Sequence, residues 1–327
     1  MAMSVKRKVR GGVALIKALE AHGVRTTFGI PGVHTLDAYD ALYDSDHIAT
    51  ILPRHEQGAG YMADGAYRAT GKPGVALIVT GPGVTNVVTA AGEAFADSSR
   101  VVVIATNLER KYLDSLEGNL HEMKDQMGVM RPVTKWAHRV MSAKEISSAV
   151  AEAFRQVQSG RGRPVYLEIP IDVMAEEVEI DELPVGEGER TAPDPAQVAE
   201  AADLIAAANR VFIFAGGGCD DEEVSPLLRE LAHELGAPVC TSLMGKGAIP
   251  EDDDYAVGAF GYRWSPNSPI VPLMKGSDLT IAIGTGLGVR TTAQGTMPLP
   301  TPLIHIDIDP HEIGRRYPTA VGIVADA

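Results

Sequence analysis

The chain has 327 residues, a length that corresponds to roughly two domains of ~150 residues each. Acidic residues outnumber basic ones by 43 to 29, and the net charge of −14 argues against a nucleic-acid partner, because phosphate binding needs a basic surface. The hydrophobic share of 45% is that of an ordinary globular protein, and no apolar run approaches the ~18 residues of a membrane helix, so we expect no membrane partner.

In the first half of the chain, short β-branched runs alternate with alanine-rich stretches. Continuous apolar runs of this length are typical of strands buried on both faces of a parallel sheet, and the stretches between them are typical of helices that cover it. One stretch carries an apolar helical stripe at Ala59, Met62, Ala63, Ala66 and Tyr67. The predicted strands are 24–28, 48–52, 75–79, 101–105 and 165–169, and the predicted helices are 11–22, 35–43, 57–70, 84–96 and 143–158.

Residues 172–193 interrupt this alternation. The segment is acidic and shows no helical stripe, so we predict a solvated linker between a first domain, 1–171, and a second domain, 194–327. A second α/β set follows, which completes a prediction of two doubly wound parallel-sheet domains. Its predicted strands are 211–215, 238–241, 279–283, 303–307 and 320–324, and its predicted helices are 195–208, 222–235 and 269–275.

The cysteine content and the N-terminus indicate the compartment. Two cysteines, Cys219 and Cys240, are too few for a disulfide framework or a four-cysteine zinc site, and they indicate thiols in a reducing environment. The first ten residues are basic, but no apolar core follows them, so we predict no signal peptide. We therefore expect a cytoplasmic protein.

Two glycine-rich turns each join a predicted strand to a predicted helix: GPGVTN at 81–86 and GGG at 216–218. Such glycines let the backbone approach a ligand, and the following helix N-terminus offers N–H donors to an anion. Neither turn completes G-x-G-x-x-G, and no acidic residue ends the strand 238–241, so an NAD-dependent oxidoreductase is disfavoured. A tight turn alone explains the same glycines.

Glu56 follows the strand 48–52 and opens a helix. Since ligands of open α/β sheets bind at the carboxyl ends of strands, its carboxylate is a candidate proton donor in that crevice. The alternative is a first-turn glutamate favoured by the helix dipole alone. His305, Asp307 and Asp309 share one face of a strand, as metal ligands would, but Asp before Pro is also an ordinary turn, and we predict no metal site.

In their order and spacing, several segments resemble thiamine-diphosphate-dependent enzymes, above all acetolactate synthase large subunits and 2-oxo-acid decarboxylases. The resemblance covers nearly the whole chain. It implies a pyrimidine-binding N-terminal domain followed by a Rossmann-like middle domain. The segments that carry it are FGIPG (28–32), RHEQGAGYMADG (54–65), ATGKPG (69–74), GPGVTN (81–86), RPVTK (131–135), GRPVYLEIPID (162–172), GKGAIP (245–250), AIG (282–284) and HIDID (305–309).

The resemblance assigns Glu56 the catalytic role of the family's glutamate, which hydrogen-bonds the aminopyrimidine ring of thiamine diphosphate and promotes deprotonation of the thiazolium ring. The cofactor then attacks a small-molecule 2-oxo acid, which loses carbon dioxide. Residues implied to bind this cofactor are Pro31, Gly32, Val33, Gly81, Pro82, Asn86 and Glu122.

The middle domain of acetolactate synthases binds FAD as a structural cofactor, and some relatives bind ADP there or leave the site empty. The resemblance therefore implies FAD or ADP as a second cofactor. The residues that match this region are Gly216, Gly217, Gly218, Gly284, Arg290, Asp307 and Asp309.

The chain also departs from the family's pattern. The family's third domain carries a Gly-Asp-Gly motif that holds magnesium and the diphosphate, and no Gly-Asp-Gly occurs here. We therefore expect inactivity without a separately supplied diphosphate-binding domain, and a homodimer or a heteromer with such a subunit. His121 and Glu122 stand where acetolactate synthases have Phe-Gln, and Val33 and His34 replace a small pair. The alternative function is a non-catalytic FAD- or ADP-binding module.

Overall fold

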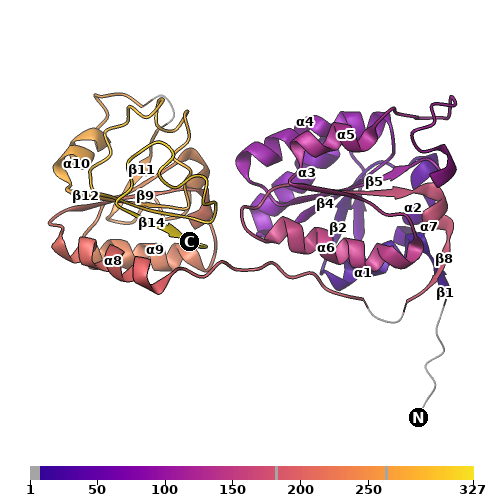
Figure 1. Ribbon diagram of the computed structural model, residues 1–327, viewed down its shortest axis with the longest axis horizontal. Helices are drawn as coiled ribbons and strands as arrows, with labels where there is room; N and C mark the ends of the chain where they lie inside the picture. The colour runs from indigo at the N-terminus through magenta and orange to yellow at the C-terminus, as the bar shows by residue number, and fades with distance from the viewer. Residues whose placement is uncertain (1–7, 181–182, 262–263) are drawn as a thin grey trace, which may run out of the picture. The chain divides into compact units, whose positions relative to one another are not determined.

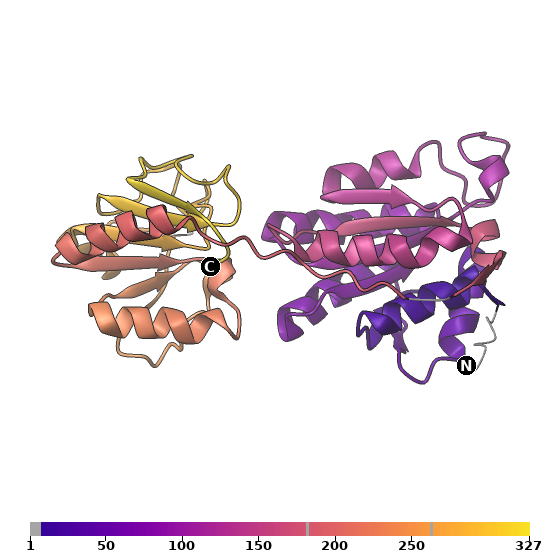
Figure 2. The same ribbon diagram turned by 60° about the horizontal axis from the view of Figure 1, so that its bottom comes forward.

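The computed structural model describes residues 8–180, 183–261 and 264–327. The chain divides into two compact units, Met1–Glu189 and Arg190–Ala327. Each unit contains one six-stranded sheet in which every described strand pair is parallel, with helices on both faces (Figure 1). Figure 2 shows the same layering from a turned view. The predicted fold class, two doubly wound parallel-sheet domains, is confirmed.

The sheet of the first unit has the strand order β3-β2-β4-β5-β7-β6. Its central strands β4, β5 and β7 are buried along their whole length, which explains their predominantly apolar sequences. The strands are β2 (Thr26–Phe28), β3 (Ala49–Ile51), β4 (Gly74–Ile78), β5 (Val101–Asn107), β6 (Trp136–Arg139) and β7 (Val165–Pro170).

Alternate side chains of these strands enter two separate cores. Val75 and Leu77 pack with α1, α2 and α6 on one face, whereas Ala76 and Ile78 pack with α3, α4 and α5 on the other (Figure 1). The helices are α1 (Gly11–Ala21), α2 (Leu36–Tyr43), α3 (Glu56–Thr70), α4 (Pro82–Asp97), α5 (Gln126–Met130) and α6 (Ile146–Gln158).

The predicted linker 172–193 is only partly without regular structure. Its beginning forms α7 (Ile171–Ala175) and β8 (Glu177–Glu179), and β8 pairs antiparallel with β1 (Lys8–Arg10). Val173, Met174 and Val178 are buried in the core of the first unit. These three apolar residues are not apparent from the acidic composition. Among the described residues of the segment, Glu176, Ile180 and 183–193 lie in neither helix nor strand.

The sheet of the second unit has the order β11-β10-β9-β12-β13-β14. One face packs against α8 and α9 and the other against α10 (Figure 1). No helix among the described residues is long and apolar enough to cross a membrane. The elements are α8 (Pro195–Ala207), β9 (Val211–Ala215), α9 (Val224–Leu235), β10 (Val239–Thr241), β11 (Ala256–Ala259), α10 (Ile270–Gly276), β12 (Leu279–Ile283), β13 (Leu303–Asp307) and β14 (Val321–Val324).

Candidate functional site

The strand order of the first unit reverses between β2 and β4, and a reversal of this kind marks the usual ligand site of an open α/β sheet. The segments that follow β2, β3 and β4 meet at this carboxyl edge. They contain Pro31 to Val33 after β2, Glu56 after β3, and Gly81 and Pro82 after β4. The fold therefore brings segments that are far apart in the sequence to one edge of the sheet.

Glu56 is the first residue of α3 and is only 9% exposed. Its Oε2 accepts a hydrogen bond of 2.9 Å from the side-chain amide of Asn86 on α4. No other hydrogen bond to this carboxylate occurs among the described residues, so its Oε1 is available to a ligand. A Cβ atom at Gly83 would lie 3.7 Å from Cγ of Glu56, which shows how closely the start of α4 approaches it.

Gly81 forms a turn that only glycine fits. Its φ is +66°, and a Cβ atom there would lie 2.3 Å from the carbonyl oxygen of His121. Its backbone N–H donates a 2.9 Å hydrogen bond to Oε1 of Gln126. The loop that contains His121 and the helix that contains Gln126 therefore hold this turn from two sides.

Gln126 belongs to a buried polar network that the sequence analysis missed. Nε2 of Gln126 lies 2.9 Å from Oε2 of Glu168 and 3.0 Å from the hydroxyl of Tyr166. Oε1 of Gln126 accepts a 2.6 Å hydrogen bond from the hydroxyl of Thr80. Asn107 donates to Oε1 of Glu168 at 2.9 Å, and the Arg139 guanidinium also binds this oxygen. The fully buried carboxylate of Glu168 therefore has hydrogen-bond and ion-pair partners, and Gln126 connects it to the Gly81 turn.

Burial and the neighbouring Glu168 carboxylate raise the pKa of Tyr166 well above its usual range, so that its hydroxyl is a permanent donor in the network. The sequence signal for this network was weak. Glu168 lies in one of the segments that carry the family resemblance, yet nothing in its spacing of 42 residues from Gln126 places the two together.

Glu122 is occupied within its own loop. Its carboxylate accepts backbone hydrogen bonds from Glu117 at 3.0 Å, Gly118 at 2.6 Å and Asn119 at 3.1 Å. The structure thus gives Glu122 a loop-stabilising role, and its predicted contact with a cofactor stays a prediction.

In the second unit, the strand order reverses between β9 and β12. Gly216 to Gly218 follow β9, and Gly284 follows β12. The two turns pack backbone against backbone: Gly218 N–H donates to the Gly284 carbonyl at 3.0 Å, and a Cβ atom at Gly216 would lie 2.2 Å from that oxygen. These glycines are needed for the turn contact itself, whether or not a ligand lies beside them.

Of the remaining residues of the predicted nucleotide site, Asp307 lies at the same edge, because it ends a strand parallel to β12. Arg290 belongs to the long segment after β12, and Asp307 ends the adjacent strand β13. Asp307 accepts a 2.9 Å hydrogen bond from the backbone of Asp309, as in an ordinary Asx turn, and His305 contacts the Thr285 carbonyl at 2.8 Å. Within the described residues, no group of three or more His, Cys, Asp or Glu side chains could hold a metal ion.

Comparison with protein families shows which family this chain belongs to. Residues 9–129 match the N-terminal TPP-binding domain of thiamine pyrophosphate enzymes, and residues 198–327 match their central domain. The chain belongs to the thiamine pyrophosphate enzyme family. Thiamine pyrophosphate is another name for thiamine diphosphate, so the family resemblance of the sequence motifs is confirmed.

Individual members of the thiamine pyrophosphate enzyme family are similar over almost the whole chain. A probable 2-ketoarginine decarboxylase of Pseudomonas aeruginosa is 38% identical over 99% of this chain and 57% of its own length. A probable acetolactate synthase large subunit of Methanocaldococcus jannaschii is 39% identical over 98% of this chain and 54% of its own length. The acetolactate synthase large subunit IlvB1 of Mycobacterium tuberculosis is 39% identical over 98% of this chain and 52% of its own length. The chain therefore spans about half the length of the curated relatives it matches.

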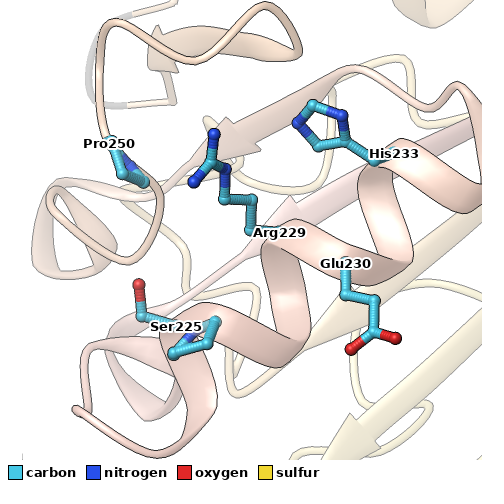
Figure 3. A pocket seen from close by; sticks show the side chains of 6 residues that line it. Ser225, Arg229, Glu230, His233 and Pro250 are labelled. Carbon is cyan, nitrogen blue, oxygen red and sulfur yellow. The ribbon is translucent and has the colours of Figure 1, made fainter.

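One hollow in the second unit involves none of the predicted site residues. It has a volume of about 460 Å³ and lies along α9 (Figure 3). Arg229 and His233 lie on the same side of this helix, and Glu230 points away from them. Nε of Arg229 and Nε2 of His233 lie 2.6 and 3.0 Å from Oδ2 of Asp253. The polar groups of this hollow are thus used to hold the buried Asp253. It is lined by Ser225, Pro226, Arg229, Glu230, His233 and Pro250.

Proposed function

We propose that the chain is the pyrimidine-binding and middle part of a thiamine-diphosphate-dependent enzyme that acts on 2-oxo acids, as a decarboxylase or a carboligase. The observation that carries this proposal is the carboxylate of Glu56, which is nearly buried at the switch point of a domain of this family, with one oxygen held by Asn86. Relatives named for decarboxylation and for acetolactate synthesis support both reaction types equally.

The residues around Glu56 fit the aminopyrimidine half of the cofactor. Oε1 of Glu56 is available to a ring nitrogen, and a hydrogen bond made by a side chain this buried is strengthened by the low local dielectric. Gly83 keeps the space beside Cγ of Glu56 narrow but open. When bound, thiamine diphosphate supplies the carbon nucleophile and the electron sink for loss of carbon dioxide.

Within this site, Glu56 holds and transfers one proton at Oε1, as general acid–base catalysis requires. Asn86 donates to Oε2 and thereby fixes the carboxylate in one orientation. The Gly81 turn, held by Gln126 and by the backbone of His121, gives the start of α4 a fixed position relative to Glu56. These residues orient the cofactor, which carries the bond-breaking chemistry.

We further propose that activity needs a diphosphate- and magnesium-binding domain and a homodimer, or a heteromer with a subunit that carries this domain. Support comes from large apolar side chains that are exposed on α3, at the end of β3 and directly after it, and between β2 and the start of α2, because such side chains mark interaction surfaces when they gather. They are Val33, Leu36, Ile51, Leu52, Tyr61 and Met62.

For the middle unit we propose weak binding of FAD or ADP at the β9–β12 edge. The support is the backbone N–H donors of the Gly216 to Gly218 turn and the placement of Arg290 in the segment after β12. Calorimetry with each nucleotide tests this assignment, and the absence of heat at millimolar concentration would overturn it. Nucleotide binding combined with full independence of activity from Glu56 would favour the alternative, a non-catalytic nucleotide-binding module.

Glu56→Gln tests the central proposal in the enzyme assembled from this chain and a diphosphate-binding domain. Glutamine keeps the size and one hydrogen bond but cannot transfer the proton, so kcat/KM should fall by about 10²–10⁴-fold. The melting temperature should change little, because a first-turn glutamate contributes only about 0.3–1 kcal/mol through the helix dipole.

Glu93→Gln is the matched control, since Glu93 is an exposed glutamate of the neighbouring helix α4. This variant should keep both activity and stability. If Glu56 served only the helix dipole, Glu56→Gln would keep its activity and lose a little stability. Full activity of Glu56→Gln would therefore overturn the proposed function.

A further inference from the structure

Two histidines face each other beside the Gly81 turn. His34 lies in the short 3-10 turn Val33–Thr35 after β2, and His121 lies in the loop after β5. Their ring centroids are 5.6 Å apart, with an angle of 33° between the ring planes. The backbone of His121 contacts Gly81, so the pair lies next to the edge that holds Glu56.

Both imidazoles have unused hydrogen-bonding capacity. Among the described residues, no group hydrogen-bonds the buried Nδ1 atoms of His34 and His121, and His34 as a whole is only 8% exposed. Buried polar atoms are almost always paired in folded proteins, because leaving them unpaired costs free energy. Two adjacent imidazoles, each with a buried nitrogen that no described residue pairs, therefore indicate a ligand that the described residues do not supply.

The local backbone also favours a functional role for the pair. His121 adopts a φ of +63°, a left-handed conformation that a residue with a side chain rarely takes. Such strained positions gather at binding sites, where the surrounding structure enforces them. The turn that carries His34 is fixed by reciprocal hydrogen bonds between Thr35 and the backbone of Gly32, of 2.9 and 3.0 Å. Both rings are therefore presented from constrained backbone.

Two facing imidazoles suit a ligand with two acceptor atoms. Burial, and in addition the neighbouring His121, lower the pKa of His34, so that His34 is neutral at pH 7. A neutral imidazole donates one N–H, and a half-turn of the ring about χ2 exchanges the positions of its nitrogens and carbons. Two facing rings can thus direct one N–H each to the two oxygens of a carboxylate. A metal ion is disfavoured, because the described residues supply no third ligand to form a set.

We propose that His34 and His121 together bind the carboxylate of the 2-oxo acid. This inference rests on the proposed function, and it makes the pair a determinant of substrate class. Glu122 does not compete for these rings, since its carboxylate is bound by residues 117–119 of its own loop.

The test is a titration of the chain, labelled with ¹⁵N-histidine, followed by NMR of the imidazole nitrogens. Pyruvate should shift the signals of His34 and His121 in a saturable way, whereas pyruvamide, which is nearly isosteric but uncharged, should not. His47 is exposed and serves as the internal reference that stays unchanged. The two signals are assigned by their loss in His34→Gln and His121→Gln.

Each single variant should weaken pyruvate binding, read from the remaining histidine, by about 10- to 100-fold, the usual effect of losing one hydrogen bond to a charged group. Equal shifts with pyruvamide or with inorganic phosphate would overturn the carboxylate assignment. An unchanged spectrum with pyruvate in the wild-type chain would overturn the site altogether, independently of how the variants fold.

Glu56→Gln separates this inference from the proposed function. The variant should retain the pyruvate-induced histidine shifts, because the carboxylate site does not use Glu56. If Glu56→Gln kept full activity but pyruvate still shifted both histidines, the proposed function would fail and the anion site would stand. If activity fell as expected but no histidine responded, the histidine proposal alone would fail.

Discussion

Two separate constraints, one on the backbone conformation and one on the space for a side chain, apply at Gly81. Its φ of +66° disfavours any side chain, and the space for a Cβ atom is already filled by the backbone of His121. Alanine at this position should cost about 1–2 kcal/mol for the left-handed conformation and about 1–3 kcal/mol more for the overlap. We therefore expect Gly81→Ala to lower the free energy of unfolding by several kcal/mol in urea titrations.

Gly118 provides the matched comparison, because its φ is +85° and a Cβ atom there would meet no atom of the described residues within 4 Å. Gly118→Ala should lower the free energy of unfolding only by the cost of the left-handed conformation. Equal losses in the two variants would show that the contact with His121 relaxes freely, and that the turn is less rigid than described.

Asp253 makes the second unit sensitive to acid. Hydrogen bonds from His233, the Tyr255 backbone and Arg229 lower the pKa of Asp253 from 3.8 to about 2. A folded-state pKa below the unfolded-state value stabilises the fold at pH above about 4, and this stabilisation disappears as the pH falls toward about 2. The melting temperature of the second unit should therefore drop over this range.

Asp253→Asn should reduce this acid sensitivity, so that the difference in melting temperature between wild type and variant shrinks from pH 5 to pH 2. Asp252→Asn, at the exposed neighbouring position, is the control and should follow the wild type. A difference that stayed constant across this range would mean that the hydrogen bonds to Asp253 do not depend on its charge.

At the residue scale, the position of Glu56 was predictable because it follows directly from strand order. A residue that closes one parallel strand must lie at the same edge as residues that close its neighbours. The Gln126–Glu168 contact was not predictable in this way. Glu168 lies within β7, and the register between β7 and β5 places it opposite Ala105. No local pattern in the sequence specifies this register.

Among the elements, α3 shows where hydropathy alone fails. Of the predicted stripe, Ala59 and Ala63 are buried, but Met62 is 41% exposed, and the buried face instead includes Gly60 and Asp64. Gly60 allows α4 to approach. Asp64 pairs at 3.0 Å with Arg68 of the same helix, and Arg68 also pairs at 2.9 Å with Asp97 of α4. The stripe prediction was therefore wrong at Met62, because a glycine contact and an ion pair define this interface.

Two glycines of α3 should respond to alanine with opposite signs. A Cβ atom at Gly60 would lie 2.6 Å from Cβ of Ala90 on α4, whereas a Cβ atom at Gly65 would have no atom within 4 Å in the part of the chain that the structure describes. Gly60→Ala should destabilise the first unit by about 1–3 kcal/mol through overpacking. Gly65→Ala should stabilise it by about 0.5–1 kcal/mol through helix propensity. Thermal and urea unfolding of both variants measure this, and destabilisation by both would mean that α3 is not held as described.

The elements that the sequence did not reveal are short and half-buried. β6 has intermediate exposure at all four positions, and β11 includes Gly258 with a φ of +88°. Both are edge strands of their sheets. β6 and β11 lack the apolar run that made the central strands easy to predict, and only their pairing partners identify them.

For the molecule as a whole, the position of the domain boundary has a measurable consequence. We propose a boundary near Glu189, because the chain divides there, rather than at residue 171 as the acidic composition suggested. A chain ended at residue 171 loses Val173, Met174 and Val178 from its core. Each buried side chain of this size contributes about 1.5–3 kcal/mol, and the sum is comparable to the total stability of a domain.

We therefore expect residues 1–189 to unfold cooperatively in calorimetry and residues 1–171 to show a broad, weak transition. The comparison of the two chains under identical conditions is its own control, since they differ only in α7, β8 and the residues that follow. A sharp transition of the shorter chain would place the boundary at residue 171 after all.

The strand order of the first sheet has a consequence for synthesis on the ribosome. β7 pairs on one side with β5 and on the other with β6, although it follows both in the chain. A nascent chain that has released β2 to β6 thus holds an open edge at β5 and a β6 strand with no partner, for the seconds that translation needs to reach Pro170. β1 remains without its pairing strand for longer still, because its partner β8 is translated after β7. The nascent protein is therefore most exposed to aggregation when nearly all of its first unit has already emerged.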